Sequence, residues 1–378
     1  MNRTVCTRCV MDTSDEKITF NSVGECSHCQ IFDKDSQSMW FPNETGKQKL
    51  GKILEQIRKE GEGKEYDCII GLSGGVDSSY LALKMKDWGL RPLVVHIDVG
   101  WNSELAVHNI EQIVKYCGFD LYTDVMDWEE VRDLQVAYLK SGVSNQDVVQ
   151  DHAIFSSLYH FAVQNGIRYV ISGGNMATES VAPHSWHHSA MDSINLRAIH
   201  KRFGHKKLQS FKTISFFQYF FYYPFIKKMT TIRPLNYMPY NKKEALEELV
   251  RTVGYKEYGR KHGESRFTKF FQNYYLPKKF DYDKRKVHLS SLILSGEITR
   301  DCALKELEKP LYDPVELKND KEYVAKKLKL SVVELDQLID EPGRSYVEFD
   351  NWDRHYALLQ KLKNILQKVT NKKIKTYA

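Results

Sequence analysis

Residues 66–79 read Tyr66-Asp67-Cys68-Ile69-Ile70-Gly71-Leu72-Ser73-Gly74-Gly75-Val76-Asp77-Ser78-Ser79. The run begins with apolar residues typical of a buried strand, breaks at the Ser-Gly-Gly turn, and continues with apolar residues at helical spacing. A strand, a glycine turn and a helix N-terminus together form an anion site, because backbone N–H groups can approach a phosphate closely. The candidate ligands in this loop are Ser73, Gly74, Gly75, Ser78 and Ser79, with Asp77 as a carboxylate ligand for Mg²⁺.

The loop differs from a Walker A sequence, since no Gly-Lys-Ser/Thr follows its glycines. Instead, Ser73-Gly74-Gly75-Val76-Asp77-Ser78 resembles the pyrophosphate-binding loop (PP-loop) of the N-type ATP pyrophosphatases, which include GMP synthetase and NAD synthetase. The resemblance implies cleavage of ATP to AMP and pyrophosphate, with AMP transferred to an oxygen that a nucleophile then displaces. The alternative is a glycine turn without a site.

The composition is ordinary for a soluble globular protein, and the net charge is modest for the length of the chain. The chain has 378 residues, 42% of them hydrophobic and 28% charged, and a formal net charge of +6. This charge fits a nucleotide ligand and does not require nucleic acid. Residues 1–3 lead straight into a cysteine pair rather than a signal peptide, and no apolar run reaches the roughly 20 residues of a membrane helix. We expect a cytoplasmic protein without a membrane span.

Two Cys-x2-Cys pairs, separated by sixteen residues, stand at the N-terminus. The four residues are Cys6, Cys9, Cys26 and Cys29. This spacing is typical of a structural zinc site with four thiolate ligands, and we expect no catalytic role for such a closed site. Two disulfides are the alternative, which a cytoplasmic setting disfavours. His28 lies inside the second pair and is expected to be a bystander.

Strand-like and helix-like segments alternate after the PP-loop, which predicts an α/β fold with a doubly wound parallel sheet and ligands at the carboxyl ends of the strands. Asp98 ends one predicted strand, and in the resembled superfamily this position faces the adenosine; capping of the following loop is the alternative. The expected strands are 93–98, 120–126 and 169–172, and the expected helices are 103–117, 128–140 and 148–165.

A second glycine turn, Ser172-Gly173-Gly174-Asn175-Met176-Ala177-Thr178-Glu179-Ser180, follows the last of these strands. It resembles the Gly-x-x-Asn-x-x-Glu region of NAD synthetase, although the spacing to the Glu is one residue longer. The resemblance implies that Gly173 and Asn175 contact the nucleotide and that Glu179 helps to bind Mg²⁺; a turn with a capping Asn is the alternative. Three histidines follow, at positions 184, 187 and 188, for which substrate contacts or loop packing are more plausible than a metal.

The block from Arg260 to Arg300 clusters Lys, Arg, His and Ser/Thr donors with aromatic residues, a combination that suits a phosphate together with a sugar or base. A solvated helix face is the alternative. Together with Cys6-Thr7-Arg8-Cys9-Val10-Met11-Asp12-Thr13-Ser14 and the second glycine turn, this block resembles the N-acetyl sugar amidotransferases of bacterial surface-polysaccharide and flagellin glycosylation. The resemblance covers roughly residues 3–310. It departs at Asp281, where a Gly is expected, and at Lys286, where an Arg is expected.

This resemblance implies an ATP-dependent, AMP-forming amidotransferase that converts an acetamido group of a nucleotide-linked or nonulosonic sugar into an acetamidino group. ATP, Mg²⁺ and structural Zn²⁺ are the implied cofactors. It implies catalytic roles for Asp77, Lys284 and Arg285, and the implied substrate ligands are Lys261, His262 and His288.

Ammonia is expected to come from partner proteins. Outside the zinc quartet remain Cys68, Cys117 and Cys302, none of which lies in a Gly-x-Cys-x-Gly elbow. The resembled family uses a separate glutaminase, similar to the histidine-pathway amidotransferase, with a cyclase-like barrel as conduit. Two other functions remain open: a tRNA-thiolating PP-loop enzyme, and a catalytically silent zinc-bearing interaction protein.

We predict three domains: a zinc module at 1–45, a PP-loop ATP pyrophosphatase domain at 46–255, and a substrate-binding block with a helical C-terminal region at 256–378. Residues 191–229 are an aromatic and basic insertion whose fold the sequence does not define. For the C-terminal helices we expect packing against the core or a contact within an oligomer such as a homodimer, in preference to DNA binding.

Overall fold

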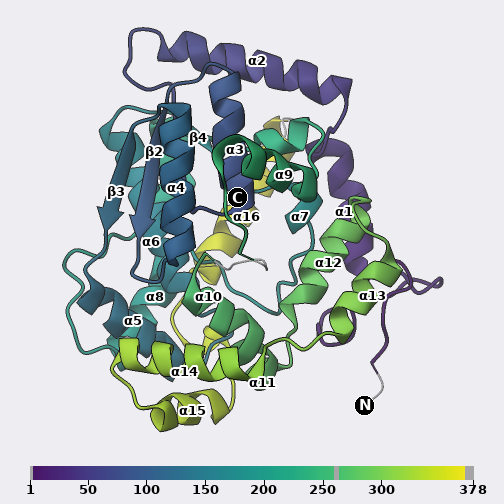
Figure 1. Ribbon diagram of the computed structural model, residues 1–378, viewed down its shortest axis with the longest axis vertical. Helices are drawn as coiled ribbons and strands as arrows, with labels where there is room; N and C mark the ends of the chain where they lie inside the picture. Colours follow the sequence, from purple (N-terminus) through teal and green to yellow (C-terminus); the bar gives the residue numbers. More distant parts are fainter. Residues whose placement is uncertain (1–2, 259–263, 371–378) are drawn as a thin grey trace.

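A five-stranded parallel sheet with the strand order β3-β2-β1-β4-β5 forms the centre of the computed structural model, which describes residues 3–258 and 264–370 (Figure 1). Ile69 of β1 pairs with Leu93 of β2 on one side and with Val170 of β4 on the other, both in parallel register. The strand order therefore reverses beside β1, at the carboxyl end where ligands of such sheets bind. The strands are β1 (Cys68–Gly71), β2 (Pro92–Asp98), β3 (Leu121–Val125), β4 (Tyr169–Ile171) and β5 (Thr230–Ile232).

Helices cover both faces of the sheet, because alternate side chains of the buried strands point to opposite sides. Ile70 packs in one apolar cluster with residues of four helices, whereas its neighbour Ile69 packs in the other cluster. The first face carries α2 (Glu44–Gly61), α3 (Val76–Asp87), α4 (Glu104–Cys117) and α9 (Lys242–Val253), and the second carries α5 (Trp128–Ser141) and α6 (Val148–Gln164). The predicted fold class is confirmed.

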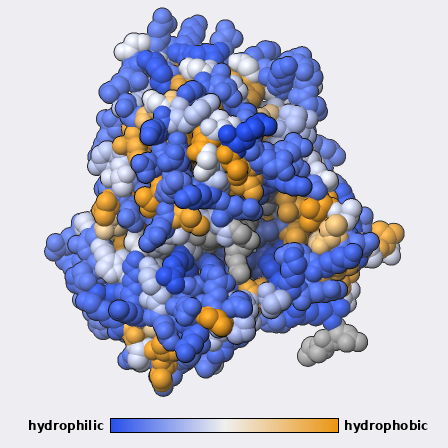
Figure 2. Space-filling model, in the orientation of Figure 1, coloured by the Kyte–Doolittle hydropathy of each residue, from blue (hydrophilic) through white to orange (hydrophobic). Residues whose placement is uncertain are grey.

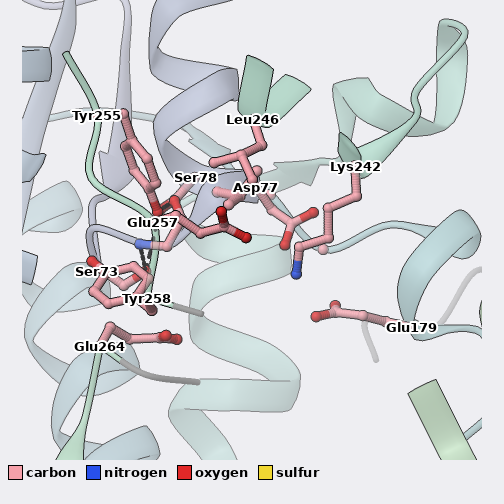
Figure 3. A pocket seen from close by; sticks show the side chains of 14 residues that line it. Ser73, Asp77, Ser78, Glu179, Lys242, Leu246, Tyr255, Glu257, Tyr258 and Glu264 are labelled. Carbon is pink, nitrogen blue, oxygen red and sulfur yellow. Dashed lines mark hydrogen bonds between the residues drawn. The ribbon is translucent and has the colours of Figure 1, made fainter. Parts of the chain in front are cut away.

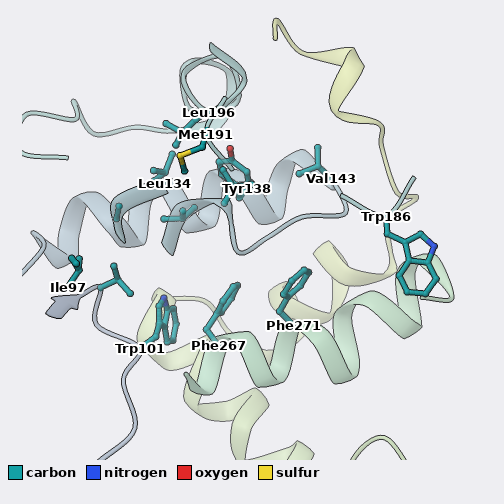
Figure 4. Packing of buried hydrophobic residues seen from close by; sticks show 14 of the residues in the cluster. Ile97, Trp101, Leu134, Tyr138, Val143, Trp186, Met191, Leu196, Phe267 and Phe271 are labelled. Atoms are coloured by element: carbon teal, nitrogen blue, oxygen red, sulfur yellow. The ribbon is translucent and has the colours of Figure 1, made fainter. Parts of the chain in front are cut away.

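The C-terminal helices pack against the second face. Trp101, after β2, packs against Phe267 with ring centroids 5.0 Å apart and ring planes tilted by 32°, and Figure 4 shows Phe267 and Phe271 facing the α5 residues Leu134 and Tyr138. These helices are α10 (Arg266–Phe270), η3 (Phe271–Tyr275), α11 (Leu276–Phe280), α12 (Lys284–Leu294), α13 (Arg300–Glu308), α14 (Pro314–Leu328), α15 (Val332–Asp340), η4 (Tyr346–Glu348) and α16 (Asp353–Thr370). Of the alternatives considered for the C-terminal helices, the structure shows packing against the core for α14 and α15.

The insertion that the sequence left undefined contains α8 (Ser193–Phe203) and a π-helix, η1 (Gln218–Ile226). Phe220 and Tyr223 of η1 are buried, whereas Phe225 and Ile226 are exposed, so the aromatic run is only half buried. Within the described part of the chain, no helix has both the length and the apolar character needed to cross a membrane. Two short helices, α7 (Met176–Glu179) and η2 (Pro234–Tyr237), follow β4 and β5.

The N-terminal cysteine module, which ends in α1 (Ser27–Met39), lies against α12 and α13. Arg300 donates to the carbonyl oxygens of Cys9 and Cys6 at 3.0 and 2.9 Å, and Lys286 forms a buried ion pair with Asp12. Buried residues of the module, the sheet and the C-terminal helices share one apolar cluster. The domain boundaries near residues 45 and 255 stay a prediction.

Candidate active site

The PP-loop connects β1 to α3 at the carboxyl edge of the sheet. Gly74 has a φ of +82°, and a Cβ there would lie 2.7 Å from the carbonyl oxygen of Ala106, so only glycine fits. Ser73 Oγ accepts the N–H of Gly75 at 3.2 Å, and Ser78 Oγ donates to the Gly75 carbonyl at 3.2 Å. These bonds fix the turn so that the N-terminus of α3 faces the space above the sheet edge.

A cavity of about 360 Å³ opens beside this loop, at the lower end of the volumes typical of small-molecule sites. Figure 2 shows that the same side of the molecule is hollowed near its centre, between the part that carries α3 and α9 and the part that carries α10 and α14. Figure 3 shows the lining side chains at close range. The lining residues are Ser73, Gly75, Val76, Asp77, Ser78, Gly173, Gly174, Glu179, Lys242, Leu246, Tyr255, Glu257, Tyr258 and Glu264.

The two glycine turns meet at this cavity, as expected if both serve one ligand. A Cβ on Gly173 would lie 3.2 Å from the backbone of Asp77 and Ser78, so glycine permits the close approach. Asn175 uses its amide in both directions: Oδ1 caps α7 by accepting the N–H of Thr178 at 3.0 Å, and Nδ2 donates to Asp77 Oδ1 at 3.3 Å. Asn175 therefore caps a helix, as in the alternative interpretation, and also contacts a residue of the site.

Three tyrosines that sequence reasoning missed complete the site. Tyr240 donates to Asp77 Oδ1 at 2.5 Å, and Tyr255 and Tyr258 both donate to the carbonyl oxygen of Gly74 at 2.8 Å. Burial raises the pKa of Tyr258 to about 12 and also raises the pKa values of the other two, so all three are neutral donors near pH 7. Their only sequence signal is their position on either side of the predicted helix at 243–253.

The described lining of the cavity carries four carboxylates and one ammonium group, that of Lys242. The carboxylates are Asp77, Glu179, Glu257 and Glu264. A phosphate ligand would be repelled by these carboxylates unless divalent cations neutralised them, and Mg²⁺ is commonly held by one or two carboxylates together with substrate phosphates. The donor set therefore fits Mg²⁺, with Asp77 and Glu179 as the predicted ligands, and the ion would supply charge neutralisation to a bound polyphosphate.

The helix α12 brings part of the basic block toward this site, because it packs on α7, whose last residue is Glu179. Ser291 Oγ of α12 accepts the N–H of Val181 at 3.0 Å. Lys284 and His288 lie one turn apart on α12 and so share a face of the helix. Lys261 and His262 fall outside the described residues.

Most of the C-terminal helical region matches a known protein family. Residues 264–363 match the family model described as "LPS biosynthesis protein WbpG-like, C-terminal domain". They form a WbpG-like C-terminal domain. The match supports, over this region, the family resemblance found in the sequence, and it begins at Glu264, which lines the cavity beside the PP-loop.

Two solved structures are similar to the chain at a low level. One is an NH3-dependent NAD synthetase from Campylobacter jejuni in complex with the nitrate ion, with 16% identity and a TM-score of 0.27, covering 35% of this chain and 58% of that one. The other is the NMN synthetase from Francisella tularensis, with 14% identity and a TM-score of 0.34, covering 76% and 98%. At this level of similarity, neither structure indicates a function for this chain. No curated protein matches the chain.

Two predicted site residues, Arg285 and Ser79, lie elsewhere than expected, and a third, Asp98, caps a loop. Arg285 of the WbpG-like domain pairs with Asp283 at 2.8 Å and donates to the carbonyl oxygens that end α13, the nearest being that of Lys309 at 2.7 Å. Its guanidinium thus has a structural role, because these contacts use all of its side-chain nitrogens. Ser79 is fully buried within α3 and does not line the cavity. Asp98 accepts the N–H of Gly100 at 2.8 Å, which is the loop-capping alternative; its adenosine contact stays a prediction.

The two departures from the family pattern have structural explanations. Asp281 adopts a left-handed conformation, φ +61°, as the C-cap of α11, and glycine is the usual residue there. Lys286 is buried and bonded to Asp12, so it connects the cysteine module to α12 and is not a phosphate ligand.

The four N-terminal cysteines fit a zinc ion. Their sulfur atoms all lie within 4.8 Å of one another, with Sγ–Sγ distances of 3.6 Å for Cys9–Cys26 and Cys26–Cys29 and 3.8 Å for Cys6–Cys29. Four sulfurs at about 2.3 Å from one tetrahedral zinc are about 3.8 Å apart. All four cysteines are free and buried, which contradicts the disulfide alternative. His28 bonds to Asp15 at 2.8 Å, outside the cluster.

The three histidines after the second glycine turn do not form a metal cluster among the described residues. His188 bonds to Asp192 at 2.7 Å and stacks on Tyr346 with ring centroids 3.8 Å apart. Burial and, to a smaller extent, the charge of Lys284 lower the pKa of His187 to about 4. His187 is therefore neutral near pH 7 and lies close to Lys284.

Proposed function

We propose that the protein is an ATP-dependent amidotransferase that converts an acetamido group of a nucleotide-linked or nonulosonic bacterial sugar into an acetamidino group. The observation that carries this proposal is that the WbpG-like domain shares the PP-loop cavity. Glu264, its first matched residue, has a carboxylate oxygen 3.7 Å from where a Cβ on Gly75 would stand. A lipopolysaccharide-biosynthesis domain and a phosphate loop therefore meet at one site.

The chemistry follows from the poor reactivity of an acetamide. Its carbonyl oxygen is a poor leaving group, so ammonia does not displace it at a useful rate. Attack of this oxygen on the α-phosphorus of ATP forms an O–P bond and releases pyrophosphate, and in this proposal the loop at Ser73–Ser78 holds the pyrophosphate through backbone N–H groups and hydroxyls. Ammonia then forms the C–N bond, and AMP departs with the electron pair of the C–O bond.

A tRNA-thiolating function is the main alternative, and the cysteines argue against it. Cys68 is buried in β1, Cys117 is buried at the end of α4, and Cys302 is exposed on α13. These three thiols come from separate elements, and none of them lines the cavity. A catalytically silent interaction protein would have no need for the intact hydrogen-bonded loop and its surrounding carboxylates.

We further propose that a separate glutaminase, with a cyclase-like barrel as conduit, supplies the ammonia. Free ammonium ions at high concentration should then replace both partners in an assay of the isolated protein. A homodimer also remains a proposal.

The test is incubation of the protein with ATP, Mg²⁺, a high concentration of ammonium ions and UDP-linked diacetamido hexoses, followed by mass spectrometry. Replacement of one oxygen by NH on the sugar, with AMP and pyrophosphate as the nucleotide products, would support the proposal. Thiolation or adenylation of tRNA with no change in any sugar would refute it and favour the alternative. A Gly74→Ala variant serves as the control, because its loop cannot keep the same conformation.

A further inference from the structure

Asp151 lies in the first turn of α6, at the edge of the sheet where the PP-loop lies. In a βαβ unit the helix runs antiparallel to its strands, so the N-terminus of α6 points to their carboxyl ends. Leu158 of α6 lies 3.7 Å from where a Cβ on Gly71 would stand, at the end of β1. Asp151 is seven residues nearer the N-terminus, which places it about 10 Å further along the helix axis, beyond the strand end.

Hydrogen bonds connect this turn of α6 to the phosphate cavity. Ser265 follows Glu264 in the chain, and its hydroxyl donates to Gln150 Oε1 at 3.0 Å. Gln150 Nε2 in turn donates to Asp147 Oδ1 at 3.0 Å. The start of α6 is therefore bonded to the start of the WbpG-like domain, next to a residue that lines the cavity.

Asp147 and Asp151 lie on the same face of α6, yet their carboxylates have different surroundings. Asp147 accepts hydrogen bonds from Gln150 and from Thr268 Oγ1, both at 3.0 Å. Asp151 is closely surrounded by protein but partly accessible, and in the part of the chain that the structure describes its carboxylate has no hydrogen-bond donor. A structural carboxylate is normally hydrogen-bonded, so this one is available to a ligand.

Charges from two elements act on Asp151. Burial raises its pKa, the neighbouring carboxylate of Asp147 raises it further, and the Lys284 ammonium on α12 lowers it, with a result of about 8. On the other side of Lys284, the segment after α7 places His187, which is neutral near pH 7, and the ring of His184 lies 6.2 Å from that of His187. Asp151 can therefore gain or lose a proton near neutral pH, as a general acid or base requires.

We propose that Asp151 is the general base of the adenylation step and takes the N–H proton of the acetamide as its carbonyl oxygen attacks ATP. This inference rests on the proposed function. The carbonyl oxygen forms a bond to the α-phosphorus, pyrophosphate leaves with the electron pair of the bond that breaks, and the amide proton passes to the Asp151 carboxylate. The product of this step is an O-adenylyl imidate whose imidate nitrogen is uncharged and whose phosphate keeps its negative charge.

The second step leaves a charge that the same carboxylate can balance. The ammonia lone pair forms the C–N bond, AMP leaves with the C–O electron pair, and the three hydrogens of ammonia become distributed over the two nitrogens of a cationic amidinium group. Asp151 releases its proton to solvent and then faces this cation. Lys284 is a positioning residue here, because its charge sets the proton affinity of Asp151.

The test compares Asp151→Asn with wild type, using UDP-linked diacetamido hexoses, ATP, Mg²⁺ and ammonium ions. We expect the rate of pyrophosphate formation to fall about 10²- to 10⁴-fold, because a positioned general base contributes about that factor. Binding of ATP, measured by calorimetry, should be unchanged. Glu104→Gln is the matched control: it removes an exposed carboxylate from the first turn of α4 and should leave the rate unchanged.

The pH profile separates a base from a merely structural residue. In wild type the rate should rise as pH approaches about 8 and then level off, since the ionised form of Asp151 is the active one. Lys284→Met should move this rising part of the pH–rate profile to higher pH, because it removes the charge that lowers the pKa of Asp151. Asp147→Asn should move it to lower pH, and the Asn oxygen can still accept the bonds from Gln150 and Thr268.

Opposite shifts of the pH–rate profile in Lys284→Met and Asp147→Asn, together with a large loss of rate in Asp151→Asn, would establish the inference. If wild type amidinates a sugar but Asp151→Asn is equally active, Asp151 is not the base and the proposed function still stands. The same conclusion holds if neither Lys284→Met nor Asp147→Asn shifts the pH–rate profile. If wild type binds ATP yet modifies none of the sugars, the proposed function fails and the inference fails with it.

Discussion

Replacing Lys286 by Met should lower the free energy of unfolding by about 3–5 kcal/mol, because it removes the buried cation that is hydrogen-bonded to the buried carboxylate of Asp12. The side chains of Lys286 and Asp12 are only 11% and 5% exposed. Asp12 retains the N–H of Ser14 at 3.0 Å and the Ser14 hydroxyl as donors, and the Arg3 guanidinium lies 3.8 Å away with a side chain 36% exposed. The Ser14 groups are neutral and Arg3 is partly exposed and beyond hydrogen-bond distance, so neither replaces the buried ion pair with Lys286. Met preserves most of the aliphatic length of Lys, so the effect of the charge is isolated from that of packing.

This loss converts into a measurable shift of the melting temperature. The entropy of unfolding is about 2.1 cal/mol/K per residue, which gives about 0.8 kcal/mol/K for 378 residues. The expected decrease in Tm is therefore about 4–6 °C at pH 7, measured by calorimetry on the zinc-loaded protein. The same change should reduce amidination, because the Lys286–Asp12 pair holds α12, which carries Lys284, against the cysteine module.

The stability that the Asp12 carboxylate contributes depends on pH, and the direction of its pKa shift gives the sign of this dependence. Burial by itself raises the pKa of Asp12, but hydrogen bonds from Lys286 and Ser14 outweigh it, so the pKa lies below its usual value. The stability that this carboxylate contributes is present above its unfolded pKa of about 3.9 and is lost as pH falls through the lower folded value. In Lys286→Met the bond from Lys286 no longer opposes burial and only the bonds from Ser14 remain among those that lower the pKa most, so Asp12 takes up a proton more readily and the cost of the mutation should shrink toward pH 4.

Two further variants make the reasoning refutable. Asp12→Asn combined with Lys286→Met removes both charges and should recover a large part of the loss. Arg8→Met is the control, since Arg8 and Asp33 form a 2.7 Å pair in the same module with side chains 33% and 50% exposed, and such pairs contribute about 0–1 kcal/mol. If Lys286→Met costs no more than Arg8→Met, the argument from burial is wrong.

Four other outcomes follow from the site. Tyr240→Phe removes the hydrogen bond to Asp77 and should raise the Mg²⁺ concentration for half-maximal pyrophosphate release about 10- to 100-fold, as a Mg²⁺ titration would show. Cys26→Ser should lose the bound zinc, measured by atomic emission, and lower the Tm. Gly74→Ala should abolish pyrophosphate release with the circular dichroism spectrum unchanged, because the added Cβ would lie 2.7 Å from a backbone oxygen of α4. Arg285→Met should destabilise the protein by about 1.5–3 kcal/mol and leave the KM for ATP unchanged, whereas a role in nucleotide binding would raise it.

Local sequence determined the features that depend on near neighbours along the chain. The strand, turn and helix of the PP-loop follow from apolar spacing and glycine, and the two Cys-x2-Cys pairs specify a metal module, because a few consecutive residues fix each geometry. The alternating helices and strands were likewise predictable to within a few residues. Asn175 was found through its glycine turn, although its second contact, to Asp77, joins residues 98 positions apart.

The tertiary structure decided which side chains of the basic block meet the site and which support the fold. Arg285 and Lys284 are neighbours in sequence, yet one caps α13 and the other acts on Asp151, because successive residues of a helix point about 100° apart and meet different partners. Asp151 itself gave no sequence signal, since an acidic residue in the first turn of a helix is ordinary. Its distinction arises only from burial, from Asp147 on the same helix face, and from the approach of α12, and these depend on contacts between residues far apart in the chain.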